Sequence, residues 1–224
     1  LRYTKMSSTD EDLSKRLSLL HSSIVHDALR MEGLSNQTLP YQIRPISSGK
    51  TISGKVWTLS GELQENISVH ESLLSWTSFL SEVQPDTVVV CQPNNQSIAL
   101  MGELSAETLV KKNIKGYVVD GGCRDVKRIK AIGFPVYCKF YSPKDVAGKW
   151  KVTELGKKIK IGEVSITTGD YIIGDDDGIV IIPESIAEQI IIKAENDMTS
   201  ENKIRDAILN GVDPQKAYLK YGKF

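Results

Sequence analysis

Two short apolar runs near the middle of the chain constrain its fold more than any other feature. They are Thr87-Val-Val-Val-Cys91 and Gly116-Tyr-Val-Val119. Runs of this length without polar alternation are typical of strands covered on both faces. Helical patterns follow at residues 102–112 and 126–132, and another strand pattern follows at 136–140. This alternation of strand and helix predicts an α/β core with right-handed crossovers.

The regions on either side add further elements to this core. Residues 50–61 alternate enough to form a strand, and Ser68 with Glu71 predicts a capping box at the start of the helix that follows. Residues 157–183 change character, because short strand patterns there are separated by glycines. They predict a β-rich block packed on the core. A helical pattern returns from residue 184 to 210 and ends at Gly211.

The N-terminal region also has a helical pattern. Leucines 13, 17 and 20 recur at helical spacing, and Ser22 or Ser23 is expected to cap a second helix. No repeat or low-complexity linker forces a second domain. The sequence therefore predicts one domain over residues 13–224, which includes a C-terminal helical segment, preceded by an N-terminal extension, residues 1–12.

Charge and hydropathy exclude several broad classes of function. The chain has 28 basic and 28 acidic side chains among 224 residues, which leaves none of the excess positive charge expected of a general nucleic-acid binder. No apolar stretch approaches the roughly 20 residues that span a bilayer. The three cysteines lack zinc-site spacing and are interpreted as reduced thiols. We expect a cytoplasmic protein with no nucleic-acid or membrane partner.

The most informative stretch for function is residues 102–125. Gly102 precedes a predicted helix whose first turn is Glu103, Leu104 and Ser105, so unpaired backbone N–H groups and the positive end of the helix dipole are available to a carboxylate. Arg124 and Asp125 follow the strand at residues 116–119 and its Gly-Gly turn. Ligands of open α/β sheets bind at that edge of the sheet.

Arg124 and Asp125 have two interpretations. The guanidinium can grip a carboxylate or a keto oxygen, and the adjacent carboxylate can bind Mg²⁺ or Mn²⁺, a combination that suits a 2-oxo acid. The alternative is structural, with Asp125 capping the helix at residues 126–132. From the residues alone, the structural alternative is favoured.

Several motifs together resemble a known family. Gly102-Glu-Leu-Ser105, then Val118-Val-Asp-Gly-Gly-Cys-Arg-Asp125, then Gly133-Phe-Pro-Val136 look like the signature of the RraA-like family, which includes 4-hydroxy-4-methyl-2-oxoglutarate aldolases. Residues 23–29 and 169–183 resemble the opening helix and the late hairpin of that family. The resemblance spans nearly the whole chain. It implies a swivelling β/β/α fold, similar to phosphohistidine domains, with helices at both ends.

The resemblance also implies roles for individual residues. The amides of residues 102–105 (Gly102, Glu103, Leu104 and Ser105) would hold a pyruvyl carboxylate, Arg124 would contact the keto oxygen, and Asp125 would serve the divalent metal. A family glutamate, supplied by a neighbouring subunit to activate water, matches Glu201, with Glu195 nearby. The assembly implied is a homotrimer or a dimer of trimers with active sites at subunit interfaces.

Two functions follow from this resemblance. One is a divalent-metal-dependent lyase, a class II pyruvate aldolase or oxaloacetate decarboxylase, that acts on 4-hydroxy-2-oxo (di)carboxylic acids or oxaloacetate through a pyruvate enolate. The alternative is a non-catalytic binding protein that regulates a ribonuclease. The regulatory branch of the family lacks the aspartate after the arginine, so Asp125 favours the lyase.

Overall fold

One mixed sheet organises the chain in the computed structural model, which describes residues 8–222. Its strand order is β1-β6-β4-β3-β2-β11-β12, and β8 pairs with β2 outside this path. These strands are β1 (Arg44–Pro45), β2 (Ile52–Leu63), β3 (Thr87–Gln92), β4 (Gly116–Val119), β6 (Val136–Cys138), β8 (Trp150–Leu155), β11 (Tyr171–Gly174) and β12 (Ile179–Ile182). The central strands β2, β3, β4 and β6 are parallel, whereas β1, β8, β11 and β12 pair antiparallel.

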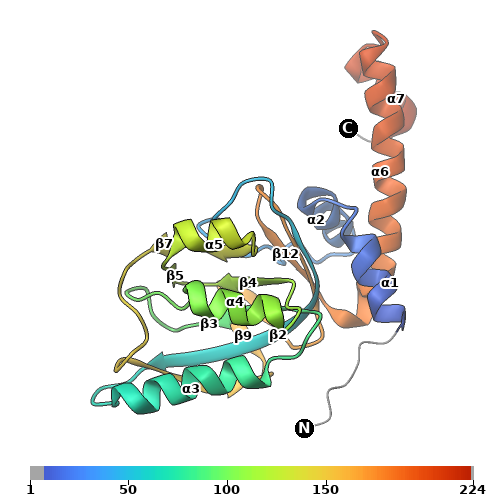
Figure 1. The fold of residues 1–224 in the computed structure, drawn as a ribbon. Helices are drawn as coiled ribbons and strands as arrows, with labels where there is room; N and C mark the ends of the chain where they lie inside the picture. The colour runs from blue at the N-terminus through green and yellow to red at the C-terminus, as the bar shows by residue number, and fades with distance from the viewer. Residues whose placement is uncertain (1–7, 223–224) are drawn as a thin grey trace.

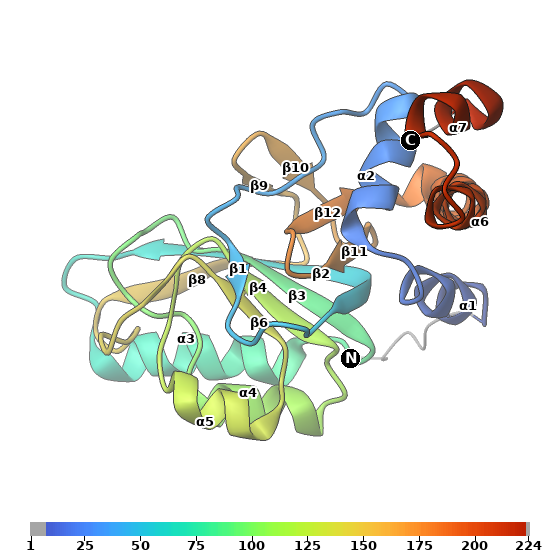
Figure 2. The same cartoon turned by 90° about the horizontal axis from the view of Figure 1, so that it is seen from above.

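Three helices cover one face of the parallel strands, as Figure 2 shows. They are α3 (Val69–Glu82), α4 (Glu103–Lys111) and α5 (Val126–Ile132). The predicted capping box is confirmed, because Ser68 and Glu71 bond reciprocally at the start of α3. All four residues of β4 are buried, as expected of a strand covered on both faces. The predicted α/β core is therefore confirmed.

The sheet curls at its β11–β12 end because both faces of this hairpin are apolar. Tyr171 and Ile173 pack with the terminal helices, whereas Ile172 and Ile181 belong to a second cluster with Val90. That second cluster also includes the hairpin of β9 (Ile159–Ile161) and β10 (Val164–Ile166). These contacts fold the antiparallel end of the sheet over the parallel strands and confirm the expected β-rich block.

The pairing of the long strand β2 with β8 is irregular near the end of β2. The register of β2 against β8 shifts between Ser60 and Gly61. A Cβ atom at Gly61 would lie 2.2 Å from the Trp150 ring, so only glycine allows the two strands to approach here.

The terminal helices pack against one another beside the curled end of the sheet. They are α1 (Ser8–Leu17), α2 (Ser22–Met31), the short 3₁₀ helix η1 (Glu184–Ile186), α6 (Ala187–Leu209) and α7 (Pro214–Tyr221). Arg16 of α1 donates two hydrogen bonds to Glu195 of α6, at 2.7 and 2.9 Å. The far end of α6 and α7 projects away from the sheet (Figure 1). Residues 8–12, which the sequence assigns to the extension, begin α1.

The predicted cap of α2 is wrong. His21 occupies the N-cap position, but its side chain makes no capping hydrogen bond, and neither Ser22 nor Ser23 caps the helix. Instead Asp175, from the β11–β12 turn, accepts hydrogen bonds from the Ser22 amide and hydroxyl, both at 2.7 Å. The capping carboxylate is thus 153 positions away in the sequence. The turn joins β11 and β12 in the late hairpin that the resemblance implies.

One predicted strand is divided in two. Residues 136–138 form β6 in the main sheet, but β7 (Phe140–Tyr141) leaves it to pair with β5 (Gly122–Cys123). Lys139, between them, donates its backbone N–H to Gly121 O at 2.8 Å, which holds the chain where it leaves the main sheet.

Among residues 8–222, no helix is long and apolar enough to cross a membrane.

Candidate functional site

Backbone hydrogen bonds bring Arg124 and Asp125 to the start of α4. After β4 ends, Gly122 forms a parallel bridge with Ala99, and its carbonyl accepts the Leu100 amide at 2.9 Å. The Arg124 amide donates to Met101 O at 2.9 Å. The segment before α4 and the segment after β5 therefore run side by side. This pairing places the two motifs, 22 positions apart in the sequence, at one site.

Asp125 turns back toward α4 instead of capping α5. Its backbone is left-handed, with φ 54° and ψ 30°, and its side chain makes no hydrogen bond to α5. Asp125 thus occupies the N-cap position of α5, as the structural alternative expects, but its side chain does not cap that helix. Instead, Asp125 Oδ2 accepts the Glu103 amide at 3.1 Å and lies 3.3 Å from Arg124 Nε. A Cβ atom at Gly102 would lie 2.9 Å from the same oxygen, so a side chain at this position would displace the Asp125 carboxylate.

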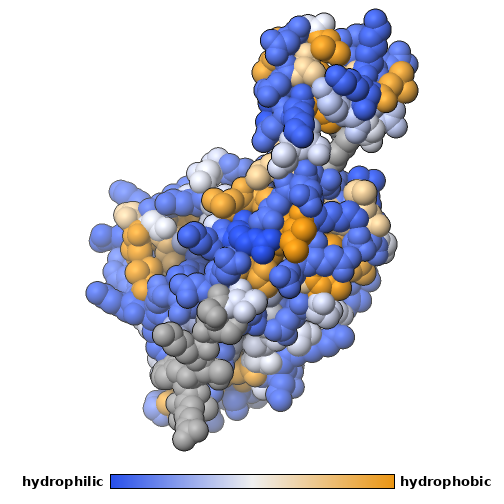
Figure 3. All heavy atoms as spheres, turned by 90° about the vertical axis from the view of Figure 1, so that its right-hand side faces the viewer, coloured by the Kyte–Doolittle hydropathy of each residue, from blue (hydrophilic) through white to orange (hydrophobic). Residues whose placement is uncertain are grey.

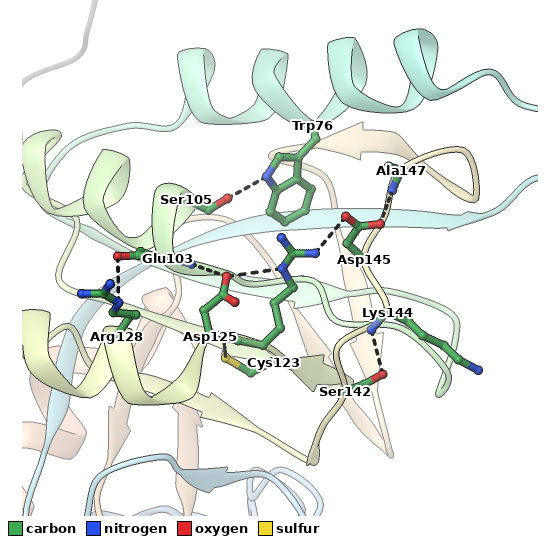
Figure 4. A network of polar contacts seen from close by, with 11 residues as sticks. Trp76, Glu103, Ser105, Cys123, Asp125, Arg128, Ser142, Lys144, Asp145 and Ala147 are labelled. Atoms are coloured by element: carbon green, nitrogen blue, oxygen red, sulfur yellow. Dashed lines mark hydrogen bonds and ion pairs between the residues drawn. The ribbon is translucent and has the colours of Figure 1, made fainter.

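Arg124 lies between two carboxylates. Its Nη1 donates to Asp145 Oδ2 at 2.8 Å, while its Nε faces Asp125. Asp145 Oδ1 accepts the Ala147 amide at 3.2 Å, which fixes the carboxylate in its loop. Asp145 could not be predicted from the sequence, because a lone aspartate after Ser-Pro-Lys carries no signal for pairing with an arginine 21 positions earlier. In Figure 4 the Asp125 and Asp145 side chains point toward a common region below Trp76.

The first turn of α4 provides backbone N–H donors beside Arg124 and Asp125. The Glu103 amide is taken by Asp125, so the amides of Leu104 and Ser105 remain as the outward-facing donors of that turn. The Ser105 hydroxyl accepts Trp76 Nε1 at 2.9 Å, which ties α4 to α3. The Glu103 amide is thus occupied within the chain, and the binding of a carboxylate by the other first-turn amides stays a prediction.

These groups line one cavity of about 330 Å³. Every residue predicted to bind substrate or metal in the stretch 102–125 contributes to its lining, namely Gly102, Glu103, Leu104, Ser105, Arg124 and Asp125. Asp145, Trp76 and other α3 side chains complete the wall. The formal charge of the lining is negative, since three carboxylates surround one guanidinium. The cavity therefore favours a cation beside any bound anion.

Glu201 lies elsewhere in the chain. It belongs to the projecting part of α6 and lines a separate hollow with Ile204 and Arg205. Figure 3 shows this end of the molecule as a knob set apart from the body, with apolar side chains on its surface. Glu195, the other glutamate considered, is held by Arg16, whose hydrogen bond lowers the Glu195 pKa. Neither glutamate is brought to the cavity within one chain.

Cys123 is a buried thiol next to the site. The contact with Cys138, burial and the nearby Asp125 carboxylate all raise the pKa of the Cys123 thiol far above its usual range. The thiol therefore stays protonated near neutral pH and is a poor nucleophile. This agrees with the interpretation of the cysteines as reduced thiols.

The carboxylates of the cavity are compatible with a divalent cation. Among residues 8–222 there is no group of three or more His, Cys, Asp or Glu side chains able to enclose a metal ion. Mg²⁺ does not require such an enclosure, because it keeps several waters and is commonly held by one or two carboxylates together with the substrate. Asp125 Oδ1 accepts no hydrogen bond from the part of the chain that the structure describes, which leaves it available as a ligand.

We expect Asp145→Asn to loosen the Arg124 side chain without unfolding the protein. The amide keeps the shape of the carboxylate but loses the charge-assisted bond at 2.8 Å. Binding of a 2-oxo acid such as pyruvate should weaken about tenfold, because a hydrogen bond to a charged group contributes on the order of 1.5–3 kcal/mol. Calorimetric titration measures this change, with the Asp170→Asn variant, away from the cavity, as control. Unchanged pyruvate affinity would show that Asp145 does not position Arg124.

Comparison with known proteins identifies the family. Residues 22–181 match the family model described as RraA-like, Aldolase/RraA. A protein of Halalkalibacterium halodurans named "Putative 4-hydroxy-4-methyl-2-oxoglutarate aldolase" is 27% identical, over 96% of this chain and 97% of its own length. Protein DlpA of Legionella pneumophila is 28% identical over 96% of this chain, but the chain spans only 34% of DlpA.

A solved structure shares the same architecture. Streptomyces coelicolor RraAS2, described as an unusual member of the RNase ES inhibitor RraA protein family, superposes with a TM-score of 0.79 at 26% identity, covering 88% of this chain and 98% of RraAS2. The expected mixed α/β fold with terminal helices is thus confirmed. With its family motifs gathered around one cavity, the chain belongs to the RraA-like family.

Proposed function

We propose that this protein is a divalent-metal-dependent lyase that releases pyruvate from 4-hydroxy-2-oxo acids or from oxaloacetate. The observation that carries the proposal is the position of Asp125. It follows Arg124 directly, turns back in a left-handed conformation to the start of α4, and leaves one carboxylate oxygen available in the cavity. The names of relatives such as the Halalkalibacterium protein support the same class of reaction.

Different residues of the cavity have different proposed roles in binding and catalysis. The substrate carboxylate would lie on the Leu104 and Ser105 amides, where the helix dipole adds to the hydrogen bonds. Arg124 would donate to the 2-oxo oxygen, which becomes negatively charged as the carbon–carbon bond breaks. Asp125 would hold Mg²⁺ or Mn²⁺, which would supply Lewis acidity for the 2-oxo group.

In the retro-aldol reaction the bond between C3 and C4 breaks. Its electron pair remains on C3 as the enolate of pyruvate, which then takes a proton, and the C4 hydroxyl loses a proton as C4 becomes a carbonyl carbon. Decarboxylation of oxaloacetate passes through the same enolate, with carbon dioxide as the leaving group. The family resemblance makes Glu201 of a neighbouring subunit in a homotrimer the proposed acid–base group; within one chain Glu201 lines a separate hollow.

A pyruvate-release assay tests the proposal. The protein is mixed with oxaloacetate or 4-hydroxy-4-methyl-2-oxoglutarate in the presence of Mg²⁺ or Mn²⁺, and pyruvate is measured against a metal-only background. We expect release that stops when EDTA is added. If neither substrate gives pyruvate above the background, the lyase is excluded, and inhibition of a ribonuclease becomes the function to test.

A further inference from the structure

The Ser105 hydroxyl is held by a neighbouring tryptophan at the candidate site. Trp76 Nε1 donates to Ser105 Oγ at 2.9 Å, and both residues line the cavity that contains Arg124. In Figure 4 these two side chains lie side by side above Asp125. A serine hydroxyl has one proton to donate as well as lone pairs to accept. Because Ser105 Oγ accepts the indole N–H, its own proton remains to be donated.

The proton of the Ser105 hydroxyl is not used elsewhere in the described chain. Among residues 8–222, this hydroxyl makes a single hydrogen bond, the one that it accepts from Trp76. Thr108, one turn later on the same helix, differs, because its hydroxyl donates to Leu104 O at 2.7 Å. The Ser105 proton is therefore available to a ligand in the cavity.

The same hydroxyl lies beside the backbone donors that begin α4. The first hydrogen bond within the helix runs from the Ala106 amide to Gly102 O at 3.0 Å, so the amides of residues 103–105 precede it. Side chains of a helix lean toward its N-terminus, which brings the Ser105 side chain back toward these amides. A carboxylate has about four lone-pair sites on its two oxygens. It can therefore accept the Leu104 amide, the Ser105 amide and a hydroxyl proton together.

Trp76 is fixed by packing, so it holds the hydroxyl in one orientation. Trp76 is 7% exposed, and its ring packs edge-on against Phe79 and Trp150, with centroids 5.0 and 5.9 Å apart. A donor that is already oriented loses less conformational freedom when a ligand binds. A hydroxyl that accepts an N–H is also polarised, which strengthens the hydrogen bond that it donates. Trp76 thus makes Ser105 a better donor.

We infer that the Ser105 hydroxyl donates to the carboxylate of the 2-oxo acid substrate and that Trp76 positions this hydroxyl. The inference rests on the proposed function, which places that carboxylate at the start of α4. It adds a side-chain donor to the backbone amides and gives Ser105 two contacts with one ligand. Trp76 is a positioning residue in this arrangement, because it acts through Ser105.

Removal of the hydroxyl tests the contact. Ser105→Ala deletes the donor and suits a helix, since alanine has the highest helix propensity. Pyruvate binding, measured by calorimetry with Mg²⁺ present, should weaken about tenfold, because a hydrogen bond to a charged group is lost. Ser78→Ala is the matched control, because the Ser78 hydroxyl donates to Glu82 at 2.9 Å and lies outside the cavity. Equal pyruvate affinity in the two variants would overturn the inference.

A double-mutant cycle separates positioning by Trp76 from its role in packing. Trp76→Phe removes the indole N–H together with part of the ring, so a loss of stability is expected in either background. When Ser105 is present, Trp76→Phe should weaken pyruvate binding about threefold. In the Ser105→Ala background, the same change should leave the remaining affinity nearly unaltered. An equal loss of affinity in both backgrounds would overturn the positioning role.

Steady-state kinetics distinguish failure of this inference from failure of the lyase proposal. A carboxylate contact is present in the bound substrate as well as in the transition state, so Ser105→Ala should raise KM for oxaloacetate about tenfold and leave kcat within about twofold. Turnover with an unchanged KM would overturn the inference and leave the lyase proposal intact.

Pyruvate binding decides the inference if no turnover is found. If the unmodified protein binds pyruvate but releases none from oxaloacetate or 4-hydroxy-4-methyl-2-oxoglutarate, the lyase proposal fails. Weaker pyruvate binding by Ser105→Ala would still support the inference in that case. No pyruvate binding by the unmodified protein would overturn it.

Discussion

Asp125→Asn is expected to lower kcat/KM for pyruvate release by about 100-fold or more, because it removes the proposed metal ligand. Asparagine suits this position better than alanine, since the backbone has φ 54° and asparagine tolerates the left-handed conformation. Its side-chain oxygen can still accept the Glu103 amide. The fold should therefore survive while the charge that attracts the cation is lost. Mn²⁺ titration by calorimetry should show weaker binding in parallel with the loss of turnover.

Asp86→Asn is a suitable control for this experiment. Asp86 is also left-handed, with φ 64°, but it pairs with Lys115 just before β3 and is not part of the cavity. The two variants thus share the chemical change and the backbone conformation. Both should melt within about 3 °C of the unmodified protein, as expected for partly exposed substitutions. Normal turnover in Asp125→Asn would rule out a metal ligand at this position.

Arg124→Lys is the second variant with a large expected effect. Lysine keeps the positive charge but cannot present two nitrogens in one plane to Asp125, Asp145 and a keto oxygen. We expect kcat/KM to fall about 100-fold, with most of the loss in kcat if Arg124 stabilises the developing enolate. The measurement is steady-state pyruvate release at saturating Mg²⁺.

Arg128→Lys provides the comparison for Arg124. Arg128 is on α5, its side chain is 73% exposed, and it contributes nothing to the cavity lining. Its replacement should leave kcat/KM within about twofold of the original value, as is usual for surface substitutions. An Arg124→Lys enzyme as efficient as Arg128→Lys would argue against any contact between Arg124 and substrate.

The central elements were predictable because their signals are local. The apolar run at residues 116–119 becomes β4 with the same bounds, and the Ser68–Glu71 box starts α3. The gathering of residues 102–105 with Arg124 and Asp125 was also predictable, since both motifs lie at the same edge of a parallel sheet. Local periodicity and sheet topology are enough for these features.

Features that depend on long-range partners could not be predicted. Asp175 caps α2 from 153 positions away in the sequence, and Asp145 reaches Arg124 from an irregular loop. The left-handed backbone of Asp125 reversed the expected direction of its side chain, from α5 to α4. A single sequence does not show which donors and acidic side chains, far apart along the chain, lie close together in the fold. Only the folded chain shows which of several acidic side chains each donor meets.

The pairing of the two ends of the chain has a consequence for how the protein folds during synthesis. The apolar faces of α1 and α2 are covered by β11, β12 and α6, and Arg16 meets Glu195 across 179 positions. The ribosome must therefore synthesise the chain as far as α6 before the first helices find all their partners. Contacts of such long range slow folding and leave apolar helices exposed in the nascent chain. We expect the N-terminal segment to be the part that chaperones bind until translation reaches α6.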